Sequence, residues 1–184
     1  MQPTSSHPSA MTVTTPSECE VRFTRHFKAP RALVFETFTQ PEWLRRWLIG
    51  PDGWALTVCE VDLIPGGRFR YVWTKPDGKA MGMGGRFVEV TPPSRLVHVE
   101  VFDQDWTGGE TTVTTDLAEH DGMTEMTMTV VYSSTTARDR ALATGMTSGM
   151  EMSYARLDML LASPKTCTAR SVSCRLQSVI WFGW

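Results

Sequence analysis

Six strand-like segments follow one another between residues 55 and 132, each separated from the next by a few turn-forming residues. The segments alternate apolar with polar side chains or are rich in β-branched and aromatic residues, as strands are. Glycine, proline and aspartate fill the gaps and favour tight turns. Short links allow only antiparallel neighbours, so the chain is constrained to a meander that twists and curves. The segments are Ala55–Leu63, Arg68–Thr74, Ala80–Val90, Arg95–Phe102, Gly109–Leu117 and Met123–Tyr132.

A strand and two short helices are expected before the meander, and one long helix after it. Cys19–Lys28 alternates as a first strand, and Pro30 suits the first turn of a helix. A second short helix is expected over Glu42–Leu48. From Ala137 to Ala162 apolar residues recur at helical spacing, until Pro164 ends the pattern. The predicted fold class is α+β, with a curved antiparallel sheet of about seven strands wrapped around a long C-terminal helix.

One domain is expected for a chain of 184 residues. Residues 1–17 are rich in Ser, Thr and Pro and lack the apolar stretch of a secretory signal, so they predict a disordered lead-in of a cytoplasmic protein. The domain proper is expected over residues 18–163. Residues 164–184 contain no acidic side chain and end in an aromatic run. This atypical tail is interpreted as non-native or disordered, with a natural docking segment as the alternative.

Composition excludes several classes of function. The net charge of −2 offers no basic field for nucleic acid, and no window approaches a membrane-spanning apolar run. The four cysteines lack C-x-x-C spacing and no two histidines have helical metal-ligand spacing, so no metal site and no other cofactor are predicted. Fourteen arginines against four lysines, with no asparagine, favour a bacterial source.

Four groups of residues, in the same order along the chain, resemble one bacterial family. They are Ala29-Pro30 with Val34-Phe35 and Pro41-Glu42 with Trp47; Val61-Asp62-Leu63 with Pro65-Gly66-Gly67-Arg68-Phe69-Arg70; Gly85 with Val88-Glu89-Val90 and Pro92 to Val97; and Gly149-Met150-Glu151 with Tyr154 and Arg156 to Leu161. The chain resembles the SRPBCC, or START-like, superfamily, and within it the domains related to the activator of the heat-shock protein 90 ATPase. The resemblance covers about residues 21–162. It implies a helix-grip fold with a hydrophobic cavity between sheet and helix.

Two residues depart from the family pattern. Ile64 stands where these domains often carry Arg, and Met150 stands where many carry Trp. The second change would reshape the floor of a cavity. Members of the superfamily include binders, cyclases and co-chaperones, so the resemblance does not fix the function.

Methionine and aromatic side chains fall on strand and helix faces that can meet inside the sheet. Such residues form either a filled core or the wall of an adaptable apolar cavity, and their spacing alone leaves both open. For the cavity, the predicted ligand-binding residues are Trp73, Met81, Met83, Phe102, Met128, Met146, Met150 and Tyr154, with Trp47 and Trp106 at its mouth. The alternative for the tryptophans near the short helices is that they plug the mouth of the sheet.

The glycine-rich segment at residues 82–85 leads into a strand and not a helix, so it predicts a bend and not a phosphate loop. His98 and Glu100 share one strand face, opposite Val97, Val99 and Val101, and the alternation favours solvent for them. Turned inward, they would form a pair able to move a proton. Arg68, Arg70 and Arg86 are expected on a solvated outer face.

The leading functional hypothesis is a non-catalytic protein that binds a small hydrophobic or amphipathic molecule. A cyclase-like or hydrolase-like enzyme is the second hypothesis, with Tyr154, Glu100 or His98 as its polar group, and no catalytic residue is assigned. A co-chaperone-like interaction module is the third, implied by the resemblance. The sequence leaves a homodimer open and establishes no oligomeric state.

Overall fold

The computed structural model describes residues 10–105 and 107–163. Eight strands form a single antiparallel sheet in the order β1-β2-β8-β7-β6-β5-β4-β3. Their bounds are β1 Thr12–Thr14, β2 Glu20–Phe27, β3 Ala55–Val61, β4 Arg68–Thr74, β5 Ala80–Thr91, β6 Arg95–Phe102, β7 Thr111–His120 and β8 Met123–Val131. The expected α+β architecture is confirmed, and it is that of a helix-grip fold.

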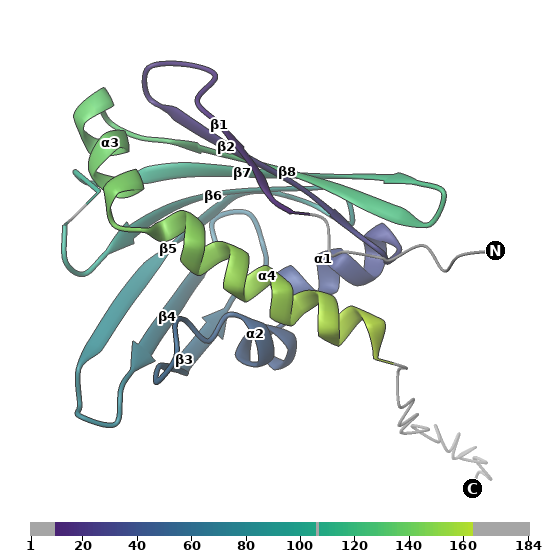
Figure 1. Cartoon of the computed structure of the whole chain (residues 1–184), viewed down its shortest axis with the longest axis horizontal. Helices are drawn as coiled ribbons and strands as arrows, with labels where there is room; N and C mark the ends of the chain where they lie inside the picture. The colour runs from purple at the N-terminus through teal and green to yellow at the C-terminus, as the bar shows by residue number, and fades with distance from the viewer. Residues whose placement is uncertain (1–9, 106, 164–184) are drawn as a thin grey trace, which may run out of the picture.

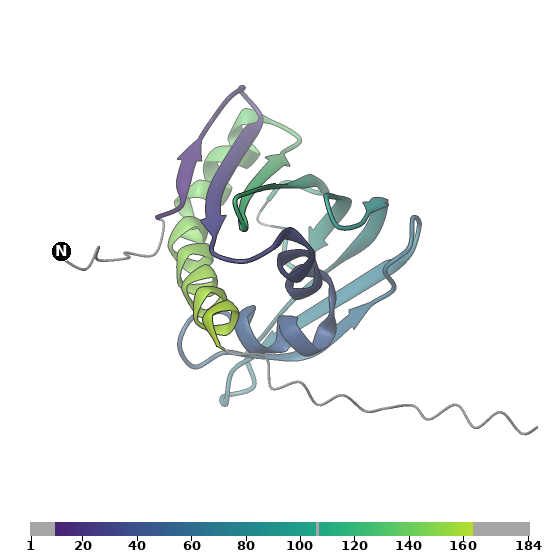
Figure 2. The ribbon, with the colours of Figure 1, turned by 90° about the vertical axis from the view of Figure 1, so that its right-hand side faces the viewer.

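Four helices accompany the sheet: α1 Arg31–Thr39, α2 Pro41–Trp47, α3 Thr135–Ala143 and α4 Met146–Ala162. Figure 1 shows α4 running diagonally across the sheet. In Figure 2 the strands curve into an open half-barrel, with α4 along its open side and α1 and α2 at one end. The face of the sheet turned towards α4 is called the inner face below, and the opposite face is the outer face.

The single long helix expected over 137–162 is wrong, because the structure divides it into α3 and α4. Gly145 lies between them with a φ of 80°, in the left-handed region that favours glycine. The Ser134 side chain caps α3 by accepting a hydrogen bond from the Ala137 backbone N–H at 3.1 Å. The break lets the chain change direction before α4 crosses the sheet.

The expectation of a disordered lead-in does not hold for Thr12–Thr14. These residues form β1 and pair with Arg22, Phe23 and Thr24 of β2. The Ser- and Thr-rich composition of this segment favoured a prediction of disorder, although Thr and Val are good strand formers. Met11 beside it packs against the core. Residues 1–9, and the tail over 164–184, lie outside the described residues.

Strand register decides which side chains reach the inner face. Met83 of β5 lies opposite Tyr71 of β4 and Phe102 of β6, while Gly85 lies opposite Phe69 and Glu100. Because side chains alternate along a strand, these residues share one face of the sheet. The buried residues of the same face form the core under α4. The inner face is therefore where a binding site would be built.

Candidate functional site

The structure brings nine of the ten predicted ligand-binding residues to the interior between the sheet and the helices, and Trp106 lies outside the described residues. All nine belong to the two core clusters or pack against them: Trp47, Trp73, Met81, Met83, Phe102, Met128, Met146, Met150 and Tyr154. Met128 and Met150 contact both clusters. The predicted residues thus come together, but they do not play equal parts.

Three of them are packed and hydrogen-bonded as core residues. The Trp47 indole N–H donates to the Thr37 carbonyl at 2.9 Å, and its ring stacks on Tyr154 with 5.8 Å between ring centroids. The Trp73 indole N–H donates to the Leu48 carbonyl at 2.7 Å. Burial raises the pKa of Tyr154, so its phenol stays neutral. Trp47 is therefore buried and packs α2 against α4, with its polar atom used inside the fold.

A second group is only half-buried. Its members are Met81, Phe102 and Met128 on the inner face, and Met146 and Met150 on α4. They pack against the buried core between the sheet and α4, and each keeps part of its surface exposed to solvent. These side chains are flexible, and methionine adapts to apolar partners of varied shape.

His98 and Glu100 also lie on the inner face, and the solvent-facing orientation favoured from the sequence is wrong. His98 pairs with Phe87 of β5 and Val113 of β7, both buried on that face. Val99 and Val101 point outward instead, and Val101 is 39% exposed. Alternation separates the two faces of a strand without saying which is inside, and valine forms strands on either.

The two side chains form a hydrogen-bonded pair. The His98 Nε2 atom lies 3.1 Å from a Glu100 carboxylate oxygen, and the side chains are 14% and 16% exposed. Nε2 donates to the carboxylate, since an ionised carboxyl group only accepts hydrogen bonds. The Nδ1 atom is buried and has no hydrogen-bond partner among the residues that the structure describes. The imidazole edge also packs against the Phe69 ring, at 5.2 Å between centroids and 87° between planes.

Two tyrosines stand within electrostatic reach of Glu100. Burial, with smaller contributions from the nearby Cys59 and Glu100, raises the pKa of Tyr71 far above its usual value. Burial and the Glu100 charge together raise the pKa of Tyr132 to about 12. Both phenols therefore stay neutral at physiological pH. The inner face combines apolar side chains with one small group of polar ones, as small-molecule sites do.

Arg25 is an inner-face residue that the sequence reasoning missed. It is fully buried, and it donates to Glu151 at 2.7 Å and to Asp158 at 2.6 Å, both on α4. Although burial by itself would lower it, these two carboxylates raise the pKa of Arg25. Its inward direction could have been predicted from its spacing from Val21 and Phe23 on the first strand, since alternate residues share a face. This ion pair fastens α4 to the sheet.

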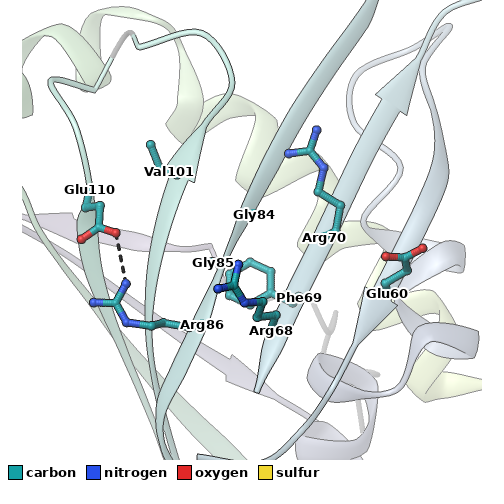
Figure 3. A pocket seen from close by; sticks show the side chains of 9 residues that line it. All are labelled: Glu60, Arg68, Phe69, Arg70, Gly84, Gly85, Arg86, Val101 and Glu110. Atoms are coloured by element: carbon teal, nitrogen blue, oxygen red, sulfur yellow. Dashed lines mark hydrogen bonds and ion pairs between the residues drawn. The ribbon is translucent and has the colours of Figure 1, made fainter. Parts of the chain in front are cut away.

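The outer face carries a separate open depression of about 460 Å³. Figure 3 shows its lining side chains over the strands, with Gly84 and Gly85 as its floor. Arg70 pairs with Asp103 and Arg86 with Glu110, so the charges around it are largely satisfied. Arg68, Arg70 and Arg86 lie on this solvated face, as expected from the sequence. Nothing in this arrangement selects a ligand.

Residues 10–105 and 107–163 were compared with the requirements of a metal site and of a membrane-spanning helix, and they meet neither. No three His, Cys, Asp or Glu side chains gather there to hold a metal ion. No helix in these ranges has both the length and the apolar character needed to cross a bilayer.

Comparison with known proteins gives the family. The sequence model of the family described as activator of Hsp90 ATPase homolog 1-like protein matches residues 28–162. The chain belongs to this family. A search of curated proteins found no significant match.

Similar solved structures support the assignment of this domain to the activator family. A protein of Rhodobacter sphaeroides is 38% identical over 83% of this chain and 98% of its own, with a TM-score of 0.79. A protein of Mycobacterium smegmatis is 26% identical over 83% of this chain and 99% of its own, with a TM-score of 0.71. One of Nitrosomonas europaea is 26% identical over 80% and 97%, with a TM-score of 0.70. The activator-family fold therefore extends over nearly the full length of each of these relatives.

Proposed function

We propose that this activator-family domain binds a small hydrophobic or amphipathic molecule between the inner face of its sheet and α4. The observation that carries the proposal is the partial solvent exposure of Met81, Phe102 and Met128 on that face and of Met150 on α4. Apolar side chains left open to water inside a curved sheet favour an apolar guest, since each square ångström removed from water contributes about 25 cal/mol. Membership of the family supports the same location.

Met150 is the position that tests this proposal. It packs against both core clusters from α4, so a larger side chain there occupies the space expected for the ligand. With decanol as a neutral amphipathic probe, Met150→Trp should weaken binding about tenfold or more, which corresponds to about 1.4 kcal/mol. Isothermal titration calorimetry of both proteins gives the comparison.

The matched control is Met159→Trp, because Met159 lies on the same helix with 65% of its surface exposed. This variant should bind decanol as the unmodified protein does. Equal decanol affinity in the Met150→Trp variant and the unmodified protein would remove the proposed location. Thermal unfolding of each variant confirms that a loss of binding does not reflect a loss of fold.

A second candidate function, a cyclase-like or hydrolase-like enzyme, is favoured by one observation. The His98–Glu100 pair lies on the inner face, where it could take a proton from a bound substrate or from water. Hydrolysis of p-nitrophenyl decanoate tests the hydrolase form. General-base catalysis by the pair predicts a rate that falls about 10²-fold or more in Glu100→Gln. A rate no higher than that in buffer would remove it. The co-chaperone alternative rests on family membership alone.

A further inference from the structure

We infer that the inner face selects an amphipathic molecule with a cationic head, such as a protonated amine, and that Glu100 is the group that receives this head. The inference rests on the proposed function and adds the chemical class of the ligand to it.

Three ionic side chains lie on the inner face of the described sheet: Arg25, Glu100 and, at the exposed end of β7, Glu119, whose carboxylate accepts a hydrogen bond from the Arg31 backbone N–H. Arg25 is fully buried, and its two terminal nitrogens are each bound to a carboxylate of α4. Among the described residues its Nε–H has no hydrogen-bond partner, but the two carboxylates outweigh its single positive charge, so an anionic ligand would gain little there. Its environment is already negative, since Glu151 and Asp158 both face a single guanidinium.

Glu100, in contrast to Arg25, has few partners for its charge. Within residues 10–105 and 107–163, the one side chain that hydrogen-bonds to it is His98, through a single carboxylate oxygen. No Lys or Arg in these ranges forms an ion pair with it. A carboxylate that is 16% exposed and has one such partner is poorly compensated for its loss of water. A cation placed beside it would supply the missing compensation.

The position of Glu100 suits this role. Its neighbours across the strands are Thr111 of β7 and Gly85 of β5, which itself has no side chain, although the Phe69 ring lies over it. The two phenols within electrostatic reach, Tyr71 and Tyr132, stay neutral because burial raises the pKa of each. They bring no competing charge. His98 acts as a positioning residue, since its Nε2–H holds one carboxylate oxygen in place.

Apolar side chains continue the site away from the carboxylate. Met83 and Phe102 lie opposite each other on β5 and β6, and Phe102 is two residues from Glu100 on the same face. A ligand with its head at Glu100 therefore has an apolar wall for its chain. The site pairs one negative group with an extended apolar surface, which is the complement of an amphipathic amine.

Three probes with one chain length test the inference: decylammonium, decanol and decanoate, each titrated into the full-length protein by calorimetry. Decylammonium should bind about tenfold or more tightly than decanol, because a charge-assisted hydrogen bond is stronger than a neutral one. Decanoate should bind most weakly. This ranking is measured on the unmodified protein and depends on no variant.

Glu100→Gln removes the charge and keeps the shape of the side chain. It should weaken decylammonium binding about tenfold while decanol affinity stays within about a factor of two. Glu110→Gln is the matched control, since Glu110 lies on the outer depression shown in Figure 3 and is 58% exposed. It should change neither affinity.

The possible results separate the two proposals. Decanol binding without any preference for decylammonium, or with equal binding of decanoate, overturns the inference and leaves the proposed function standing. An equal loss in Glu100→Gln and Glu110→Gln also overturns it, because the amine would then not lie at the inner face. Failure of all three probes to bind overturns the proposed function and the inference with it.

Discussion

Among single residues, Arg25 shows how one charge can hold two elements together. Its guanidinium is out of reach of solvent, while its partners Glu151 and Asp158 are 42% and 25% exposed. The guanidinium also lies over the rings of Phe27 and Tyr154, at 5.8 and 5.7 Å from their centroids. Burying a charge is tolerated only when it is paired, so this contact depends on α4 staying in place.

Arg25→Met should therefore destabilise the fold by about 3 kcal/mol, at the low end for removing one partner of a buried pair, because the carboxylates left behind are partly solvated. Arg22→Met is the control, since Arg22 is exposed on the opposite face of the same strand; it should change the free energy of unfolding by less than about 0.5 kcal/mol. Urea unfolding measures both. Equal effects of the two substitutions would contradict the role assigned to Arg25.

The sequence allows the direction of the Arg25 side chain to be predicted, but not that of His98 or Glu100. Arg25 alternates with Val21 and Phe23, so its inward direction follows from strand geometry alone. The direction of His98 and Glu100 did not follow, because both faces of β6 carry residues that are acceptable in a strand. Their burial depends on which neighbours β5 and β7 supply, and a single sequence does not show long-range register.

At the scale of elements, β5 illustrates why a glycine-rich segment belongs in a sheet. A side chain at Gly85 would meet the Val99 carbonyl oxygen, and it would lie 2.7 Å from the Phe69 ring. The adjacent Gly84 points to the outer face, where a methyl group would be 3.4 Å from the nearest atom, an ordinary contact. Packing therefore requires glycine at position 85 but not at the adjacent position 84.

Gly85→Ala should cost about 1–3 kcal/mol, because the backbone of β6 cannot move aside without disturbing the sheet. Gly84→Ala should cost less than about 0.5 kcal/mol. Chemical denaturation of the two variants under the same conditions makes the comparison. The account of β5 would be wrong if Gly84→Ala were the more damaging of the two.

Element positions were largely predictable, since turn residues and alternation are local signals. Arg68–Thr74 and Arg95–Phe102 were predicted with the bounds that the structure has. The break at Gly145 was not, because the apolar spacing continues across it and glycine is tolerated inside helices. The strand Thr12–Thr14 is held by pairing with β2, a contact that composition does not reveal.

At the scale of the whole molecule, the fold places α4 along the open side of a half-barrel. The buried core fixes the sheet and the short helices, and the half-exposed methionines lie beyond it. The curved sheet followed from the series of short turns, whereas the degree of filling depends on side-chain packing that no local pattern encodes. The proposed binding site is the part of the interior where these partly exposed side chains lie.

The methionines themselves allow the central claim to be tested most directly. Met81, Met83, Met128 and Met150 lie in or against the core of the inner face, while Met123, Met152 and Met159 are exposed surface residues. Nuclear magnetic resonance of the protein with labelled methionine methyl groups, titrated with decanol, reports on both sets at once. The account predicts that the inner signals shift and saturate while the surface signals stay unchanged. Unchanged inner signals at saturating decanol, with or without shifts at the surface, would contradict it.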